Sequence, residues 1–486
     1  MPISITAFDA ETLTKANINE AKDYLQFAPN IAFTEDGQTG GRSINVSIRG
    51  VSNVNLAEAT TASSIGYYID ELSVGAVSNG TINPDLQDVE RVEVLRGPQG
   101  TYFGRNALGG AINITTRKPD SKFYAEGEAG FSRFSTWDIG GVVNIPVTSN
   151  FFLRAVAKHS ESDGYIKNVN PLGTPDSGYK TNSFRIAARI LPTDKLTVDL
   201  NVNFMDEKGG MDNSVASGVL DLDTKSIFGA DFVPINQGRI GFYPANQRLV
   251  NHNHREFNNN RSLILNGRVN YEGDGFEVTS ISGYIDSKTD RSFDQDNIGV
   301  DAINRLNHWK GKSYSQELRL QSTGKRTFEW TFGGIVSKDE FKAFNSITAG
   351  SEGSYTDENG NVIGLLPPIP NGFRINENNI VYTTKSFGAF AEGTYNLTDQ
   401  LGLTIGGRFT EDKIDTSNFG VVAFEGAVPD ASGSGKFNNF SPRRVEVQGH
   451  RQYHHLRLGC AGLQDEGVDI NGGISTEVPA GEAVEL

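Results

Sequence analysis

Residues 85–119 read DLQDVERVEVLRGPQGTYFGRNALGGAINITTRKP, two alternating segments separated by a glycine-rich break. Valines alternate with charged residues over 89–95, which predicts a half-buried strand. Gly97-Pro98 ends that strand, and four more glycines before residue 111 let the backbone turn or approach another chain closely. Alternation resumes at Ala111 and stops before Pro119. Taken alone, the pattern is also typical of a glycine-rich hairpin in any β protein.

Two upstream segments change how this stretch is interpreted. Residues 43–53 (SINVSIRGVSN) and 63–74 (SSIGYYIDELSV) match, in order and spacing, an x-I-R-G strand and a Y-x-D-x-x strand. Together the three segments resemble the plug signature of TonB-dependent outer-membrane receptors. The resemblance implies that residues 1–119 form a plug domain of mixed α+β structure. Periodicity predicts a helix over 10–27 and strands near 3–8, 31–33, 44–48, 65–72, 89–95 and 111–115.

After residue 119 the pattern changes to long alternating segments joined by turns that are alternately short and long. About eleven segments each have the ten or so residues that a tilted strand needs to cross a bilayer. They are 122–133, 137–147, 151–162, 183–191, 196–205, 261–271, 276–287, 314–322, 328–338, 386–396 and 401–412. Short turns on one side and long loops on the other are typical of an outer-membrane barrel. A soluble sheet packed on one face would show the same alternation without this asymmetry.

The resemblance implies a barrel of 22 strands. We therefore predict an N-terminal α+β plug domain followed by the first half of a 22-stranded antiparallel transmembrane β-barrel over residues 120–443, with about eleven to twelve strands. Such a chain is truncated and unable to close as given, and its exposed edges would make it aggregate. Residues 1–4 lack the features of a signal peptide. The resemblance implies that a signal sequence and a TonB box precede the segment at which this sequence begins.

Composition narrows the function classes. The chain has 486 residues, of which 37% are hydrophobic, and it contains no apolar run long enough for a membrane helix. Barrel strands remain compatible, because they are apolar on one face only. The net charge of -15 disfavours nucleic acid as a partner. The single cysteine, Cys460, rules out an intramolecular disulfide and a cysteine-built zinc site.

Residues 444–486 do not continue the strand pattern. The segment 449–467, GHRQYHHLRLGCAGLQDEG, holds three of the seven histidines and has no strand period. Suitable codons for it, read one base later, encode VTDNTTIYASVAQGFKTKG, which resembles the next barrel strand of the family. We predict a frameshift between Arg443 and Gly449, so that Cys460 and the nearby histidines are accidental.

No catalytic constellation is apparent, and we expect neither a cofactor nor a bound metal. Residues 97–104 are rich in glycine but lack the Lys-Ser/Thr pair of a phosphate loop, so a structural turn is favoured. His252 and His254 could bind a metal from alternate positions of an extended loop, but no nearby cysteine or paired carboxylate completes such a site. A solvated loop is the favoured interpretation.

Charged residues of the plug motifs are the better candidates. The resemblance implies that Arg49 and Arg96, with Glu90 and Glu93, belong to a cluster that locks the plug to the barrel wall, and Arg105 is a further candidate. An arginine can hold a carboxylate bidentately, and a buried pair that loses one partner is costly, which favours all-or-none release. Ordinary solvated strand charges are the alternative.

Ligand contacts are expected from plug loops near 56–61 and 74–82 and from external loop residues such as Phe242, Tyr243 and His254. The resemblance implies a receptor in the bacterial outer membrane that imports a scarce ligand, most often an iron–siderophore complex, although carbohydrates and cobalamin also occur. Its partners would be outer-membrane lipid and a TonB-type energy transducer. The alternatives are a passive porin, which has no separate N-terminal domain, a secreted β-adhesin, and a surface hydrolase, for which no nucleophile with a base is found.

Overall fold

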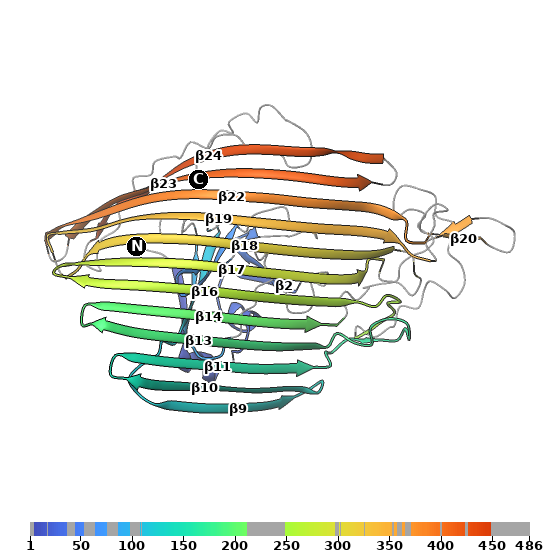
Figure 1. The fold of residues 1–486 in the computed structure, drawn as a ribbon, viewed down its shortest axis with the longest axis horizontal. Helices are drawn as coiled ribbons and strands as arrows, with labels where there is room; N and C mark the ends of the chain where they lie inside the picture. Colours follow the sequence, from blue (N-terminus) through green and yellow to red (C-terminus); the bar gives the residue numbers. More distant parts are fainter. Residues whose placement is uncertain are drawn as a thin grey trace.

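The computed structural model describes residues 4–16, 18–35, 44–52, 64–74, 86–97, 107, 109–210, 248–296, 301, 303–324, 326–351, 354–356, 362–364, 371–398, 401–422 and 426–448. Within these residues the chain forms a small N-terminal domain and a large antiparallel sheet (Figure 1). We name the first unit the plug and the second the wall. None of the helices in the described ranges has the length and apolar character needed to cross a membrane.

The plug is built on a 5-stranded mixed sheet with the order β1-β7-β8-β5-β6. Its strands are β1 (Ser4–Asp9), β5 (Ile65–Ile69), β6 (Leu72–Ser73), β7 (Val89–Arg96) and β8 (Gly110–Thr116), and a side sheet holds β2 (Ile31–Glu35), β3 (Ile44–Ile48) and β4 (Val51–Ser52). The two alternating halves of the 85–119 stretch become β7 and β8, which pair with each other. Strand β8 also pairs in parallel with β5, so all three motif segments contribute to the same domain.

The helix predicted over residues 10–27 is wrong as a single element. The structure has two short helices, α1 (Ala10–Lys15) and α2 (Ala21–Leu25). The Asp9 carboxylate caps α1 by accepting a hydrogen bond from the Thr12 backbone N–H at 2.8 Å. A capping box of Glu20 and Asp23 begins α2. The apolar side chains that suggested a continuous helix are still buried in the plug core.

The strand predicted over 65–72 contains a tight turn. Residues Asp70 and Glu71 connect β5 to β6, and both have positive φ, 48° and 69°. Positive φ at both central residues is the geometry of a type I′ hairpin turn. The turn therefore places two adjacent carboxylates at the tip of a hairpin.

The wall is a 12-stranded antiparallel sheet in which sequence neighbours are also spatial neighbours. Its strands are β9 (Tyr124–Ser132), β10 (Thr136–Thr148), β11 (Phe151–Ser162), β13 (Tyr179–Thr193), β14 (Leu196–Gly209), β16 (Phe257–Gly273), β17 (Phe276–Asp294), β18 (Ile303–Ser322), β19 (Phe328–Ala349), β22 (Arg374–Thr398), β23 (Leu401–Val422) and β24 (Gly426–Gln448). Two short pairs lie in the long loops: β12 (Lys167–Asn168) with β15 (Leu249–Val250), and β20 (Ser354–Thr356) with β21 (Val362–Gly364).

Each of the eleven predicted segments falls on one wall strand, and β24 is the twelfth. The main difference is length. Strand β18 begins at Ile303 rather than at Tyr314, and β22 begins at Arg374 rather than at Ser386. The extra residues lie at the loop ends, where polar side chains are mixed with buried apolar ones such as Trp309 and Ile380. Backbone pairing continues there, but the apolar alternation that reveals a strand in the sequence has ended.

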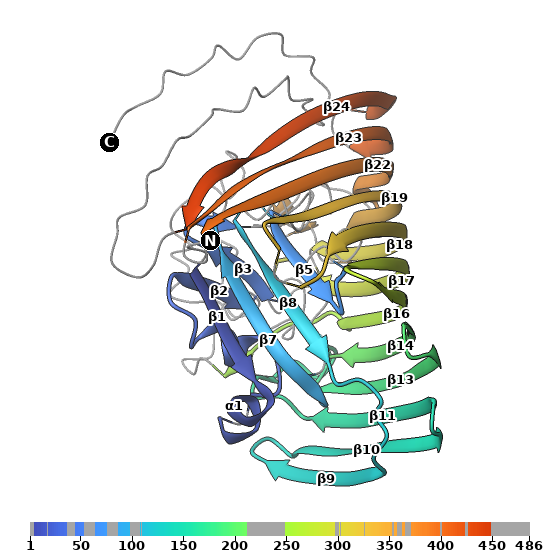
Figure 2. The same cartoon turned by 90° about the vertical axis from the view of Figure 1, so that its left-hand side faces the viewer.

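The two faces of the wall differ in composition. Large apolar side chains are exposed on the outer face, including Leu200, Val202, Leu265, Leu318, Phe332, Val336, Phe387 and Phe409. As the alternation of residues 387–395 predicts, Phe387 and Tyr395 are on this face and Glu392 is on the other. The inner face is concave and holds the plug (Figure 2). Ile264 and Ile285 of the wall join the hydrophobic cluster of the plug core.

Candidate functional site

Asp88 makes the most buried polar contact between plug and wall. It directly precedes β7 and has a positive φ of 59°, which points its side chain away from the strand face. Its Oδ2 accepts a hydrogen bond from Arg154 Nε of β11 at 2.7 Å, and it also pairs with Arg185 Nη2 of β13. The three side chains are 4%, 5% and 8% exposed. One plug carboxylate therefore pairs with two wall arginines and offsets one of their two positive charges.

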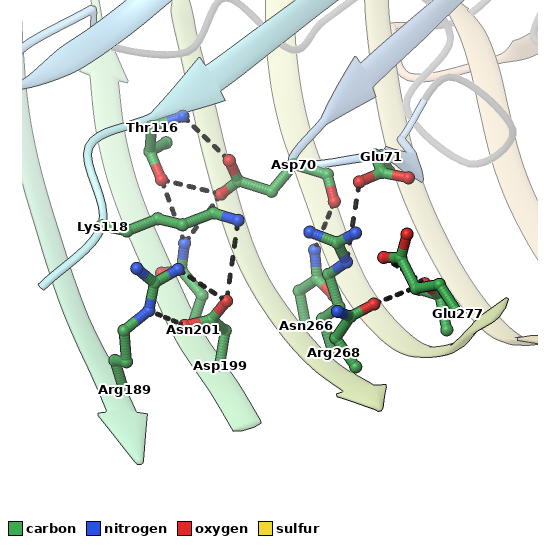
Figure 3. Close-up of polar contacts among 12 residues, drawn as sticks. Asp70, Glu71, Thr116, Lys118, Arg189, Asp199, Asn201, Asn266, Arg268 and Glu277 are labelled. Carbon is green, nitrogen blue, oxygen red and sulfur yellow. Dashed lines mark hydrogen bonds and ion pairs between the residues drawn. The ribbon is translucent and has the colours of Figure 1, made fainter. Parts of the chain in front are cut away.

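Asp70, at the hairpin tip, forms a second contact (Figure 3). Its carboxylate accepts hydrogen bonds from the Thr116 backbone N–H, the Thr116 hydroxyl and Asn201 Nδ2 of β14, each at 2.8 Å. Its backbone oxygen accepts one from Asn266 Nδ2 of β16 at 2.9 Å. Burial raises the pKa of the Asp70 carboxyl, and the bonds from Thr116 oppose that rise. The turn is thus fixed both to the plug and to the wall.

Glu71 continues this contact along the wall. Its Oε2 lies 3.2 Å from Arg319 Nη1 of β18, and its Oε1 lies 3.8 Å from Arg268 Nε of β16. Nearby, Lys118 Nζ lies 3.6 Å from Asp199 Oδ2 on β14 (Figure 3). These partly exposed pairs are weaker than the buried Asp88 cluster. Together they distribute the attachment of the plug over several strands.

A cavity of about 740 Å³ lies between plug and wall beside these contacts. It occupies the half of the wall nearest the short turns. Its lining is strongly charged, with Glu71, Glu93, Arg268, Arg319 and Arg408 among the residues that face it. Plug and wall are therefore separated here by a polar space, whereas Asp88 joins them directly.

The predicted lock residues lie close to this interface, but within the described residues their polar contacts are to the plug. Arg96 is buried, and its Nη1 donates to the Pro29 backbone oxygen at 3.0 Å. Arg91 pairs with both Glu90 and Glu93, at 3.2 Å each. Arg49 is exposed, has a φ of 52° and donates its backbone N–H to Asn30. A locking role for Arg49, Arg96, Glu90 and Glu93 stays a prediction, whereas Asp88, Asp70 and Glu71 contact the wall.

Three of the predicted site residues, Arg105, Phe242 and Tyr243, lie outside the described residues, as do most of the plug loops 56–61 and 74–82. Asp88 lies within the 85–119 stretch, but the acidic lock residues predicted there are Glu90 and Glu93. The signal of Asp88 in the sequence was local: a small acidic residue immediately before the alternating segment of residues 89–95. Arg154 had a signal too, since it is a single charge within the apolar run of residues 151–157. Arg185 shares its face of β13 with other polar residues and had no such signal.

The histidine segment is not the solvated loop that was expected. His252 is 1% exposed, and its Nδ1 lies 3.1 Å from Glu256 Oε2. Glu256 Oε1 accepts the Asp294 backbone N–H at 3.0 Å, so this segment packs on the loop end of β17. His254 Nε2 lies 2.7 Å from Ser292 Oγ, and burial lowers the pKa of His254. Within the described ranges, no three His, Cys, Asp or Glu side chains are arranged to hold a metal ion.

Comparisons with known families agree with this architecture. Residues 1–111 match the family described as TonB-dependent Receptor Plug Domain, and residues 192–443 match TonB dependent receptor-like, beta-barrel. The pesticin receptor of Yersinia pestis is 25% identical over 437 residues, covering 86% of this chain and 54% of the relative. The chain thus spans about half the length of the curated relatives it matches.

Solved structures show the same fold. The ferric yersiniabactin uptake receptor FyuA of Yersinia pestis superimposes with a TM-score of 0.70 at 19% identity, covering 92% of this chain and 61% of that one. The siderophore receptor PiuA of Acinetobacter baumannii gives a TM-score of 0.63 at 16% identity, covering 93% and 63%.

Proposed function

Because the chain belongs to the TonB-dependent receptors, β-barrel proteins of the Gram-negative outer membrane, we propose that it imports a scarce extracellular ligand by energised movement of its plug. The observation that carries this proposal is the buried pairing of Asp88 with Arg154 and Arg185. Separating one carboxylate from two buried guanidinium groups is costly. Release of the plug therefore requires work, which favours an external energy source over thermal opening.

The partner that supplies this work is a TonB-type energy transducer acting from the periplasmic side. The polar cavity lies on that side of the interface, next to the Asp70–Glu71 turn. A passive porin or a secreted adhesin would have no use for a domain held inside the wall by breakable ion pairs.

The ligand that fits best is an iron–siderophore complex. Of the solved structures described above, one is named as a ferric yersiniabactin uptake receptor and the other as a siderophore receptor, and both share this fold over most of the chain. Carbohydrate and cobalamin remain the alternatives. Contacts to the ligand would come from the long-loop side, where His254 lies.

Uptake in cells tests the proposal. Cells that lack their own siderophore receptors would express the protein as its gene encodes it and receive ferric yersiniabactin, a ferric catecholate or cobalamin. We expect uptake of at least one ferric siderophore, and we expect a protonophore to abolish it while surface binding persists. Uptake that continues without the proton-motive force would refute an energised mechanism, and uptake of cobalamin alone would refute the iron assignment.

The wall would be part of a closed barrel of 22 strands, with the periplasm at its short turns. The family match ends at residue 443, and the last described strand ends at Gln448. These ends support the proposed frameshift in the tail, which itself lies outside the described residues. Resequencing the gene tests it: an undisturbed frame without the proposed codon string would rule it out.

A further inference from the structure

Four lysines lie side by side across the wall. In the strand register Lys338 of β19 is opposite Lys385 of β22, which is opposite Lys413 of β23, which is opposite Lys436 of β24. Residues directly opposite one another in an antiparallel sheet point to the same face and lie about 5 Å apart. Like charges in such positions destabilise a sheet. Ion pairs with Glu340, Asp415 and Glu411 offset part of this repulsion for three of the four lysines. Exposed pairs of this kind contribute little, so the row still calls for an explanation other than the stability of the fold.

This row is on the outer face of the wall. One residue pair nearer the short turns, the same face carries Val336, Phe387 and Glu411, whose carboxylate pairs with Lys436 at 3.0 Å. Phe409 and Phe440 follow in the next row. The row continues onto β17 and β18 as Tyr284 opposite Tyr314, whose rings are 5.0 Å apart. Tyrosines at this position are typical of the aromatic girdle that marks the membrane interface. The lysines thus stand at the edge of the lipid-facing band, on the long-loop side.

The next two rows of outer-face residues, two and four positions along each strand toward the loops, contain further lysines. Across the three rows, from β17 to β24, the outer face carries Lys288, Lys310, Lys312, Lys338, Lys342, Lys385, Lys413 and Lys436, against Asp286, Glu340 and Asp415. We name these eight lysines the basic belt. The belt contrasts with the chain as a whole, whose net charge is -15. Its lysines are partly exposed, for example 36% for Lys312 and 59% for Lys436, even where an acidic side chain is near.

We propose that the basic belt binds the phosphate groups of the glycolipid that forms the outer leaflet of the outer membrane. Clusters of lysines next to a membrane attract anionic headgroups. The long-loop side of the apolar band is where the headgroups of the outer leaflet lie, and long lysine side chains can extend from the strand surface to reach them. Exposed ion pairs with the neighbouring acids contribute little, so they leave the lysines able to exchange partners.

Binding of lipid A by the folded protein in detergent micelles tests this assignment. The test variant combines Lys338→Gln, Lys385→Gln, Lys413→Gln and Lys436→Gln. The matched control removes four positive charges elsewhere, by Lys15→Gln, Lys22→Gln, Lys122→Gln and Lys195→Gln. We expect the test variant to bind diphosphorylated lipid A at least about tenfold more weakly than the wild type, and the control to bind it normally. Arginine at the same four belt positions should preserve binding.

Two arms use the wild type alone, so the proposal stays testable if the variant fails to fold. Wild-type binding should weaken steeply with added salt and should fall when the phosphates of lipid A are removed. Equal binding of lipid A with and without phosphates would overturn the proposal, as would equal binding by the test and control variants. Equally tight binding of phosphatidylglycerol vesicles would overturn the assignment to the outer-leaflet glycolipid. This test does not involve uptake, so its outcome is independent of the proposed transport.

Discussion

Asp88 holds one carboxylate between the guanidinium groups of Arg154 and Arg185, and all three side chains are buried. Asp88→Asn keeps the shape of the side chain and suits the positive φ, which asparagine tolerates well. It removes only the charge, so two arginines would share a buried site without that carboxylate. We expect plug docking to weaken by about 3–5 kcal/mol. The urea concentration that exposes the plug strands to hydrogen exchange measures the change.

Glu90→Gln is the matched control for this substitution. Glu90 is two residues away, is exposed, and pairs with Arg91 of the same plug strand. Neutralising it should change plug docking by less than about 1 kcal/mol. If the two substitutions shifted the urea midpoint equally, Asp88 would not be the principal attachment of the plug.

Asp70 makes the folding stability of the plug depend on pH. Burial raises the pKa of its carboxyl in the folded protein, so the folded state binds the proton more tightly than the unfolded state does. The resulting stability is fully present below the unfolded pKa of about 3.9 and is lost as the pH rises through the folded pKa. The stability of the wild type relative to Asp70→Asn should therefore fall as the pH rises, as measured by urea midpoints across that range.

Asp9 provides a control, because its contribution to stability should change with pH in the opposite direction. Its hydrogen bonds from Thr12 lower the pKa of its carboxyl, so its contribution is present above the unfolded pKa and is lost as the pH falls. The stability of the wild type relative to Asp9→Asn should rise with pH. Parallel trends for the two aspartates would contradict the assigned direction at Asp70.

For single residues, the sequence indicated the segment of the plug that lies beside the wall, but not the residues that contact the wall. The motif carrying Glu90 and Glu93 lies beside the interface, but the wall contacts come from Asp88 and the Asp70–Glu71 turn. Which carboxylate faces the wall depends on left-handed backbone positions and on the docking of two units. Neither is encoded in alternation along one strand.

The wall strands turn one face to the plug and cavity and the other to lipid, so the same substitution should have different effects on neighbouring residues. Leu318 of β18 is on the outer face and 50% exposed, whereas Ser315 lines the cavity. Leu318→Arg would place a charge in the apolar band and should cost about 2–4 kcal/mol. Ser315→Arg should cost much less, because the cavity is polar and roomy. Urea titration of the protein folded in lipid vesicles compares them, and equal losses would contradict the assignment of faces.

Strand positions were largely predictable because each membrane-crossing segment has an apolar period of two. Their ends were not, since β18 and β22 continue into regions where polar and apolar side chains are mixed, so that the apolar period of two is lost there. For α1 and α2 the predicted element was longer than the helices that form. Apolar spacing over 10–27 suggested one element, and the capping groups of Glu20 and Asp23, which compete locally with helix continuation, divided it.

Across the whole molecule, the wall ends in β9 on one side and β24 on the other, and within the described residues each pairs along one edge only. An unpaired edge presents a row of backbone donors and acceptors that can recruit another strand. The 486-residue chain folded alone in detergent should therefore associate into dimers or larger species through these edges. Excess detergent would disperse contacts between the apolar outer faces but would leave backbone pairing intact. Light scattering at high detergent measures the particle mass, and a stable monomer there would contradict the proposal that the wall needs further strands to close its barrel.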